Sequence, residues 1–460
     1  MQHYDAIVIG SGQAGTPLSR KLAGSGLKTA LIEKRWLGGT CVNDGCSPTK
    51  AMIASAKAAW SVYHNKSLGV ITDHFFLDFS AIMKRKNDIV QRMRSSSEKS
   101  IEDTQNLDLF YGNAAFSGDK QITVTLNDGG TETFTADKFF INTGEKPSIP
   151  KIEGIEDIKY LTSTTILELD SIPEHLLVLG SGYIGLEFGQ MFKRFGSKVT
   201  ILEPSERILK KEDSDIAEEV VKVLTEEDIE ILLKTKAVAV SQTGGQISVT
   251  MEKDGNQTQL NCSHILVATG RKPQTKELSL ENTGVETDEK GYIKVNDRLE
   301  TSAADIYALG DVKGGPAFTH ISYDDYRIIT ENVINKGNAS IKDRLVPYCM
   351  FIDPQLGRVG ITEQEARKQG LDILVATLKN DSVARSIETG DTRGIMKAVI
   401  DAKTKQILGA SVLAEQGGEI VTILQMAMMG NVTYDRIMNG VFAHPTYAES
   451  LNNLFMSLEQ

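Results

Sequence analysis

The sequence YDAIVIGSGQAG at residues 4–15 decides the fold, because it leads an apolar strand into a glycine-spaced turn. Gly10, Gly12 and Gly15 have the spacing of a dinucleotide-binding fingerprint. In that fingerprint the first glycine permits a tight turn, the second lets the backbone approach a pyrophosphate, and the third lets a helix pack on the strand. The N-terminus of that helix favours negative charge. The stretch therefore predicts a dinucleotide site within a strand–helix–strand unit.

A second copy of this pattern lies about one domain further along the chain. HLLVLGSGYIG at residues 175–185 contains Gly180, Gly182 and Gly185 at the same spacing. A single glycine turn before a helix is common, whereas two copies that each follow an apolar strand are a specific indication. We therefore predict an α/β fold with two Rossmann-like domains. FAD and NAD(P) are the pair of dinucleotides that a redox enzyme uses.

Each copy continues into a second strand that ends in an acid, Glu33 in KTALIEK and Glu203 in KVTILEP. A carboxylate at this point accepts hydrogen bonds from ribose hydroxyls and repels the 2′-phosphate of NADPH, so Glu203 favours NADH. Arg207, Lys210 and Lys211 follow closely and carry the opposite charge. The sequence therefore predicts NAD(H) or NADP(H), with NADH slightly preferred.

The composition is that of an ordinary globular protein. The chain has 460 residues, enough for three or more lobes, and 40% of them are hydrophobic. Its formal net charge of −11 opposes non-specific binding to nucleic acid or an anionic membrane, since both are polyanions. It begins in a strand-like run without a secretory leader, and no apolar run approaches the roughly 20 residues of a membrane helix. Four cysteines are too few for a secreted disulfide scaffold, so we expect a cytoplasmic protein.

Hydrophobic patterning organises the rest of the chain. A charged helix is predicted over residues 79–102. The pattern changes at about residue 347, where a separate C-terminal lobe is predicted to begin. Within that lobe, strand-like runs occur at 394–400 and 408–413, and a helical run covers 418–429.

The first dinucleotide unit is followed directly by a pair of cysteines. GGTCVNDGCSPTK at residues 38–50 contains Cys41 and Cys46. Zinc motifs need a second ligand pair, and Cys262 and Cys349 are isolated, so no resident metal site is predicted. A disulfide beside a flavin can accept electrons, and the thiolate formed is a nucleophile for exchange with a substrate.

Residues 39–50 resemble the redox-active helix of the class I pyridine nucleotide-disulfide oxidoreductases. That family of FAD- and NAD(P)-dependent enzymes includes lipoamide dehydrogenase, glutathione reductase and mercuric reductase. ATGR at 268–271, Gly-Asp at 310–311 and HPT at 444–446 match other landmarks of the family, so the resemblance spans essentially the whole chain. FTHIS at 318–322 is similar to the branch that contains mercuric-reductase-like and reactive-chlorine-resistance flavoproteins.

The resemblance implies a division of the chain into domains. Two Rossmann-like domains would be followed by a C-terminal α+β dimerisation domain. The implied parts are 1–150 and 276–346 for the FAD-binding domain, 151–275 for the NAD(P)-binding domain and 347–460 for the dimerisation domain.

The resemblance also implies different roles for the two cysteines. Cys46 would be the sulfur beside the flavin, and its thiolate would form the charge-transfer pair. Cys41 would be the interchange thiol that meets the substrate. Lys50 and Glu187 look like the ion pair near the flavin, and Tyr183 looks like the residue that covers the nicotinamide site.

His444 is the acid–base candidate, because an imidazole titrates near neutrality and can move a proton between thiols. By the resemblance, Glu449 would orient the ring, and this segment would come from the partner subunit. The chain would then form a homodimer with shared active sites.

Several further residues match cofactor-binding positions of the family. Asp311 would bind the ribityl chain of FAD, with Thr143 and Gly144 nearby. The other matching positions are Lys34, Gly39, Thr40, Ala114, Thr319, Ala237 and Gly270.

Two features depart from the family pattern. The chain ends at residues 455–460 without the paired cysteines of dedicated mercuric reductases, so efficient mercury reduction is not expected. Asp44 lies between the two cysteines, where relatives carry an apolar residue. Its charge could raise a thiol pKa, but we favour a solvent-facing loop acid whose charge is screened by water.

Three functions are compatible with these residues. The first is an NAD(P)H-dependent reductase of a disulfide, a metal ion or an oxidant. The second is lipoamide (dihydrolipoyl) dehydrogenase, which uses the same chemistry and is compatible with His444 and Glu449. The third, from another class, is a metal-binding or redox-sensing flavoprotein. The acceptor is not identified by the spacing of residues.

Overall fold

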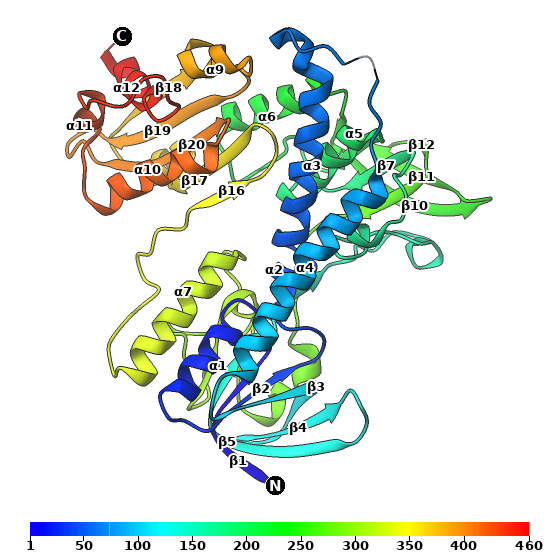
Figure 1. Ribbon diagram of the computed structural model, residues 1–460, viewed down its shortest axis with the longest axis vertical. Helices are drawn as coiled ribbons and strands as arrows, with labels where there is room; N and C mark the ends of the chain where they lie inside the picture. Colours follow the sequence, from blue (N-terminus) through cyan, green and yellow to red (C-terminus); the bar gives the residue numbers. More distant parts are fainter. Residues whose placement is uncertain (73, 460) are drawn as a thin grey trace. The chain divides into compact units, whose positions relative to one another are not determined.

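A computed structural model describes residues 1–72 and 74–459, and the chain forms two compact units (Figure 1). Each unit is assembled from three separate segments of the chain. Unit 1 comprises Met1–Ala51, Met83–Ser148 and Gly270–Arg344, and unit 2 comprises Met52–Ile82, Ile149–Thr269 and Leu345–Gln460.

Unit 1 is built on a six-stranded sheet of order β1-β2-β3-β4-β5-β15, in which β1 also pairs with β5. β1, β2 and β3 are parallel, as are β1, β5 and β15, whereas β3, β4 and β5 are joined as antiparallel hairpins. The strands are β1 (Gln2–Ile9), β2 (Thr29–Glu33), β3 (Leu107–Gly118), β4 (Gln121–Leu126), β5 (Thr131–Ile141) and β15 (Ile306–Ala308).

Helices of unit 1 bury apolar stripes against this sheet. α1 (Gly15–Gly24) packs Leu18 and Leu22 into the same core as Ile328 and Ile329, which belong to α7 (Thr319–Ile329). The strand–helix–strand order β1-α1-β2 is the arrangement that the first glycine motif predicts.

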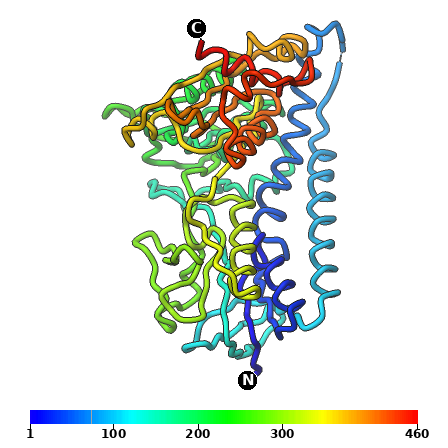
Figure 2. Tube along the Cα trace, turned by 90° about the vertical axis from the view of Figure 1, so that its left-hand side faces the viewer, coloured from blue at the N-terminus to red at the C-terminus, as the bar shows by residue number. Residues whose placement is uncertain are grey.

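Three helices follow the first dinucleotide unit: α2 (Gly39–Asn43), α3 (Cys46–His64) and α4 (Phe79–Glu102). α4 has the bounds predicted from the charged helical pattern. Within unit 1, the Arg85 guanidinium of α4 donates to the carbonyl oxygen of Ala51 in α3 at 2.7 Å. Figure 2 traces the two helices, α3 in darker blue and α4 in lighter blue. No helix among the described residues is both long and apolar enough to cross a membrane.

Unit 2 contains the second strand–helix–strand motif. A parallel sheet has the order β13-β7-β8-β9, and α5 (Tyr183–Phe195) connects β7 to β8. An antiparallel sheet of β10, β11 and β12 follows. The strands are β7 (His175–Leu179), β8 (Lys198–Glu203), β9 (Glu230–Leu233), β10 (Thr235–Thr243), β11 (Gln246–Lys253), β12 (Asn256–Cys262) and β13 (His264–Val267), and α6 (Ser214–Glu226) precedes β9.

The C-terminal lobe, also in unit 2, is a five-stranded antiparallel sheet of order β16-β17-β20-β19-β18. Its buried face packs against α10 (Gly417–Met429) through Val421 and Leu424. The remaining elements are β16 (Tyr348–Met350), β17 (Gln355–Gly360), β18 (Ile373–Lys379), β19 (Ile395–Asp401), β20 (Ile407–Ala414), α8 (Glu363–Lys368), α9 (Ala384–Thr389), α11 (Tyr434–Met438) and α12 (Ser450–Met456).

The predicted fold class is confirmed: the chain contains two βαβ units and a C-terminal α+β lobe. The strands at 394–400 and 408–413 and the helix at 418–429 are present to within one residue at each end.

Candidate functional site

The first glycine turn accepts no larger residue at its ends. Gly10 has a φ of +99°, and a Cβ there would lie 2.4 Å from the carbonyl oxygen of Asn142. A Cβ on Gly15 would lie 1.9 Å from the carbonyl oxygen of Gly10. The Asn142 side chain accepts from the Gly15 N–H and donates to the carbonyl oxygen of Leu309, both at 2.9 Å. Asn142, which the sequence did not indicate, therefore links this turn to the start of the segment that carries Asp311.

The second turn has the same construction. Gly180 has a φ of +101°, and a Cβ on Gly185 would lie 2.2 Å from the carbonyl oxygen of Gly180. A Cβ on Gly182 would meet no described atom within 4 Å. The turn is therefore tightly packed at both ends and open in the middle, where a pyrophosphate would approach the backbone.

The two strand-end acids are oriented by serines within the turns. Ser11 donates its N–H and its hydroxyl to Glu33, at 2.9 and 2.6 Å. Ser181 donates the same two groups to Glu203, at 3.3 and 2.5 Å. Burial alone would raise the pKa of Glu203, but hydrogen bonds from Ser181 and Ser205 outweigh burial and lower it. Glu203 is thus a carboxylate at neutral pH, which suits a ribose diol, and Lys210 Nζ lies 3.9 Å from it.

Gln274 brings three of the predicted FAD residues together. Lys34 Nζ donates to its side-chain oxygen at 3.0 Å, and Thr143 Oγ1 donates to its backbone carbonyl at 2.9 Å. Its own N–H donates to the carbonyl oxygen of Gly144 at 2.9 Å. No local pattern in the sequence indicates Gln274, because these partners are 130 or more residues away.

Asp311 lies in the 3₁₀ turn η6 (Gly310–Lys313), within a cluster of charges. Burial, and next the negative charge of Glu145, raise the pKa of Asp311 to about 6, and Arg271 and Lys313 oppose the rise. Glu145 is buried on β6 (Glu145–Pro147), which pairs with β14 (Arg271–Pro273). Its carboxylate accepts hydrogen bonds from the Tyr292 hydroxyl at 2.6 Å and from Arg271 Nε at 3.2 Å.

A second acid, Asp325 of α7, fixes the turn that carries Asp311. The fully buried Asp325 carboxylate accepts from the Gly310 N–H at 2.8 Å and pairs with Lys313 at 3.2 Å. Arg344 binds its other oxygen at 2.7 Å. Asp325 is therefore a structural support for Asp311 that the sequence did not reveal.

The cysteine pair lies beside α7. Cys41 and Cys46 are present as thiols, Cys41 half-buried and Cys46 exposed, and Thr319 Oγ1 lies 3.4 Å from Cys46 Sγ. The pKa of the Cys41 thiol is raised well above its usual range, first by its hydrogen bond with Cys46, then by burial and by charge on Cys46. Thr319 and Lys50 oppose that rise. The structure thus brings Cys41, Cys46, Thr319 and Lys50 together.

The loop between the cysteines is held by two arginines, Arg35 and Arg94. Arg35 binds both carboxylate oxygens of Asp44, at 2.9 and 3.3 Å. Arg94 Nε donates to the side-chain oxygen of Asn43 at 2.9 Å. Both guanidinium groups lie over the ring of Trp36, 4.5 and 4.3 Å from its centroid. We call these five residues the cysteine-loop clasp.

The expectation that Asp44 is a solvent-facing acid is wrong. Its side chain is 12% exposed and is paired with Arg35. An arginine fork, rather than water, compensates its charge. The sequence could not show this pairing, since it depends on how the chain turns between residues 35 and 44.

The other predicted positions occur as follows. A Cβ on Gly39 would lie 2.7 Å from Gly12 Cα, so this glycine lies against the first turn. Thr40 is exposed in α2, and Ala114 is buried in β3. In unit 2, Tyr183 is 38% exposed at the start of α5, and Ala237 is half-buried in β10.

Lys50 lies in unit 1 and Glu187 in unit 2. Glu187 is buried and accepts from the Phe351 N–H at 2.8 Å. Gly270, with a φ of +128°, begins the last segment of unit 1. The predicted ion pair between Lys50 and Glu187 stays a prediction.

His444 and Glu449 are brought together in unit 2. His444 Nδ1 lies 2.9 Å from Glu449 Oε2, and the histidine side chain is 65% exposed. The cysteines belong to unit 1, so the predicted meeting of His444 with Cys41 across a dimer also stays a prediction.

These residues fit the two implied cofactors. Both glycine turns leave no space for side chains at their tight ends, and each carries a serine-oriented acid at the position that suits a ribose. FAD would be held by the Gly10 turn, Glu33, the Gln274 cluster and Asp311. NAD(P) would be held by the Gly180 turn and Glu203.

Comparisons with known proteins cover the whole chain. Residues 4–325 match the family described as "Pyridine nucleotide-disulphide oxidoreductase", and residues 346–455 match its dimerisation domain. The chain is 39% identical over 459 residues to the "Probable pyridine nucleotide-disulfide oxidoreductase RclA" of Escherichia coli (strain K12), with 99% of both chains covered.

Other relatives are mercuric reductases and dihydrolipoyl dehydrogenases. The mercuric reductase of Staphylococcus aureus is 35% identical over 448 residues, covering 97% of this chain and 81% of that protein. The dihydrolipoyl dehydrogenase of Thermus scotoductus is 33% identical over 456 residues, covering 98% and 96%. Among solved structures, a Cu(II) complex of the HOCl-induced flavoprotein disulfide reductase RclA from Escherichia coli matches with a TM-score of 0.91 and 38% identity over 99% of each chain.

Proposed function

This chain is an enzyme of the pyridine nucleotide-disulphide oxidoreductase family, and we propose that it passes electrons from NADH, through FAD, to the Cys41–Cys46 pair. The pair in turn reduces an external oxidised substrate. The observation that carries the proposal is the cluster of Cys41, Cys46, Thr319 and Lys50 in the unit that contains the Gly10 turn. Members of the family are FAD- and NAD(P)H-dependent, and the sequence divides between the cofactors as 1–150 and 276–346 for FAD and 151–275 for NAD(P).

The two cysteines take different roles in this proposal. FAD, held by the Gly10 turn, Glu33 and Asp311, would supply the capacity to accept a hydride from the nicotinamide and to pass two electrons to a disulfide. The pKa of Cys41 is raised first by its hydrogen bond with Cys46, and we assign the thiolate to Cys46 on the resemblance to the family. Cys46 is then the thiolate next to the cofactor, and Cys41 attacks the substrate.

The proposed acceptor is a small oxidised species, and its class follows from the relatives. One solved RclA structure is described as a Cu(II) complex and RclA itself as HOCl-induced, so a cupric ion or a chlorine-derived oxidant is the first acceptor to test. Lipoamide is the second, because His444 and Glu449 form the dyad that a dithiol reaction needs.

The dimerisation domain implies a homodimer. We propose that His444 of one subunit serves the cysteines of the other. In each site His444 would take the proton from Cys41 through Nε2, while Glu449 binds Nδ1 and stabilises the charged ring.

Stopped-flow reduction of the yellow holoenzyme by NADH and by NADPH tests the electron path. We expect a long-wavelength charge-transfer band after two-electron reduction, formed faster with NADH because of Glu203. The band should be absent in Cys46→Ser. A band that persists in Cys46→Ser would contradict the assignment of the cysteines.

A substrate panel then separates the candidate functions. Turnover with cupric ion or hypochlorite-derived oxidants supports the reductase, and turnover of dihydrolipoamide with NAD supports a dihydrolipoyl dehydrogenase. Tight copper binding at Cys41 and Cys46 with little NADH oxidation by any acceptor would instead favour a metal-binding or redox-sensing protein.

A further inference from the structure

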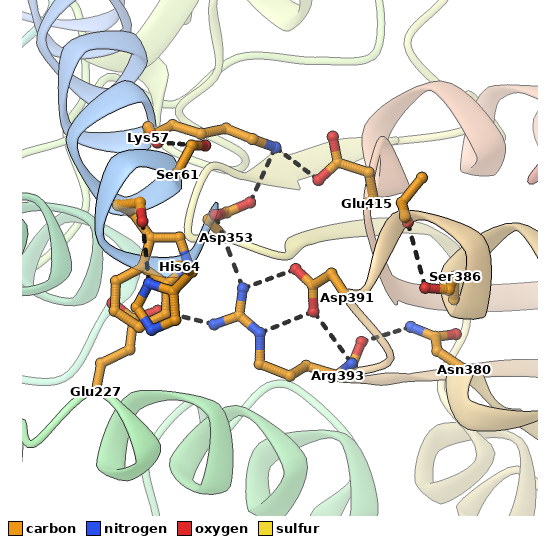
Figure 3. A network of polar contacts seen from close by, with 12 residues as sticks. Lys57, Ser61, His64, Glu227, Asp353, Asn380, Ser386, Asp391, Arg393 and Glu415 are labelled. Atoms are coloured by element: carbon orange, nitrogen blue, oxygen red, sulfur yellow. Dashed lines mark hydrogen bonds and ion pairs between the residues drawn. The ribbon is translucent and has the colours of Figure 1, made fainter. Parts of the chain in front are cut away.

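A cluster of buried and half-buried charged side chains in unit 2 is centred on Arg393 (Figure 3). Its guanidinium donates to both carboxylate oxygens of Asp391, at 2.8 and 2.7 Å, and to Glu227 at 2.8 Å. The side chain of Glu227 is 0% exposed. Because buried charges are stable only when they are paired and hydrogen-bonded, these contacts fix the turn that contains Asp391.

Helix α3 contributes two side chains to the same cluster. Lys57 Nζ donates to Asp353 at 3.1 Å and to Glu415 at 2.6 Å. The ring of Trp60 lies under the Arg393 guanidinium, 5.5 Å from its centroid. Asp353, Asp391 and Glu415 are close enough to hold a metal ion, but the lysine and arginine already bind these carboxylates.

The turn fixed by this cluster contacts the segment that carries His444. Thr389 is the last residue of α9, and Gly390, with a φ of +77°, separates it from Asp391. Thr389 Oγ1 lies 2.8 Å from the hydroxyl of Tyr447. Tyr447 is buried and follows His444 by three residues.

The position of the His444 ring depends on the backbone that carries it, since the ring itself is 65% exposed. Two local contacts shape that backbone: Thr446 Oγ1 donates to the carbonyl oxygen of Ala443 and accepts from the Glu449 N–H. Tyr447 is buried in the core of the C-terminal lobe, and its hydroxyl contact with Thr389 adds a link between the segment and the turn at 389–391.

We propose that Arg393 and Tyr447 are positioning residues for His444. Arg393 fixes the turn at 389–391, the turn fixes Tyr447, and Tyr447 fixes the backbone from which the imidazole projects. This inference rests on the proposed function, because it requires His444 to act as the acid–base group. In the dimer, Arg393 of one chain would position the His444 of the same chain, and that histidine serves the cysteines of the other chain.

Alkylation of Cys41 by iodoacetamide measures this step without the natural acceptor. The Cys41 sulfur attacks the methylene carbon, a C–S bond forms, iodide leaves, and the thiol proton moves to Nε2 of His444. Reduction of the enzyme by NADH precedes this step and does not involve His444, so the two rates separate positioning of the histidine from general loss of structure.

The first test uses Arg393→Met and Tyr447→Phe in the holoenzyme after reduction by one equivalent of NADH. We expect the rate of Cys41 alkylation, measured by mass spectrometry, to fall at least about fivefold in both variants. The rate of reduction by NADH should stay within about twofold of wild type. Tyr447→Phe removes only a hydroxyl, so it keeps the test valid if Arg393→Met fails to fold. Arg367→Met, at a surface ion pair of α8, is the matched control and should change neither rate. Unchanged alkylation in Tyr447→Phe would overturn the inference.

Mixed dimers identify the chain through which Arg393 acts. One subunit carries Cys41→Ser and supplies His444, and the other carries His444→Gln and supplies the cysteines. Adding Arg393→Met to the first subunit should slow alkylation, and adding it to the second should not. Equal slowing from both positions overturns the inference. If the mixed dimer is alkylated no faster than the His444→Gln homodimer, the shared site of the proposed function fails instead.

Discussion

Asp44 is a charged residue beside the reactive pair whose charge is matched by a neighbouring arginine. It lies within three residues of both cysteines, and Arg35 binds its two carboxylate oxygens. A bidentate guanidinium largely compensates the charge that would otherwise disfavour a thiolate. The effect of Asp44 on the cysteines should therefore become visible when Arg35 is removed.

Arg35→Met should weaken the thiolate, because it leaves the Asp44 carboxylate uncompensated. We expect the pH midpoint of the charge-transfer band to rise by roughly half a unit to one unit. Asp44→Asn leaves the Arg35 charge uncompensated and should lower the midpoint, whereas the double variant should return it to the wild-type value. A midpoint that stays high in the double variant would show that Arg35 acts through structure rather than through charge.

Asp311 predicts a dependence of stability on pH. Burial raises its pKa to about 6 in the folded protein, above the ordinary value of 3.8. Ionisation of a group with a raised pKa costs folding free energy, so its contribution to stability is full below about pH 4 and is lost as the pH rises through 6. In the FAD-free protein, Asp311→Asn should therefore melt a few degrees higher than wild type at pH 8, roughly 2–4 °C per kcal/mol. The difference should disappear near pH 4, and thermal melts across this range measure it.

At the scale of elements, positions within the second glycine turn differ in whether they tolerate a side chain. Gly180 has a φ of +101° and a Cβ there would lie 2.7 Å from the Ala268 carbonyl oxygen, whereas a Cβ on Gly182 meets no described atom within 4 Å. A glycine is therefore required at position 180 by the fold of the turn, and at position 182 only by the pyrophosphate that would approach the turn.

Gly182→Ala should therefore fold and bind FAD normally but bind NADH at least about tenfold more weakly, since the added methyl occupies the place of the pyrophosphate. Gly180→Ala should lose stability as well as NADH binding. Titration of NADH binding and thermal melts distinguish the two variants. Normal NADH affinity in Gly182→Ala would contradict the assignment of this turn to the nicotinamide cofactor.

Elements were predictable from the sequence where the determining pattern is local. The helix over 79–102 and the glycine turns follow from residues that are neighbours in the chain. Asn142, Gln274 and Asp325 were not predictable, because each acts on residues that are 12 or more positions away. Their side chains are common polar types, and only the folded sheet brings them to the turns that they support.

At the scale of the whole molecule, the candidate residues are distributed over both units. The cysteine cluster belongs to unit 1, and the Gly180 turn and the His444 dyad belong to unit 2. The family resemblance assigns His444 to the site of a partner subunit, and this assignment stays a prediction. Composition and periodicity alone do not provide it, since they carry no information on which chain completes a site.

The buried cluster of unit 2 should be a large contributor to its stability. Arg194 is 3% exposed and pairs with Glu227 and Asp353, which are 0% and 8% exposed. Arg194→Met leaves both carboxylates with fewer partners, so we expect a loss of about 3–5 kcal/mol. Lys84→Met, at an exposed pair with Asp88, should cost less than about 1 kcal/mol. Urea denaturation of the holoenzyme measures both, and equal midpoints would contradict the prediction.

The two tryptophans of the chain are divided between the units. Trp36 lies between Arg35 and Arg94 in unit 1, and Trp60 lies under Arg194 and Arg393 in unit 2. Each unit therefore contains one tryptophan fluorophore, which lies in the cysteine-loop clasp of unit 1 or in the Arg393 cluster of unit 2. In a Trp60→Phe variant, tryptophan emission reports on the cysteine-loop clasp alone. In a Trp36→Phe variant, it reports on the Arg393 cluster. The two parts of the proposed catalytic machinery can therefore be followed separately in solution without an added label.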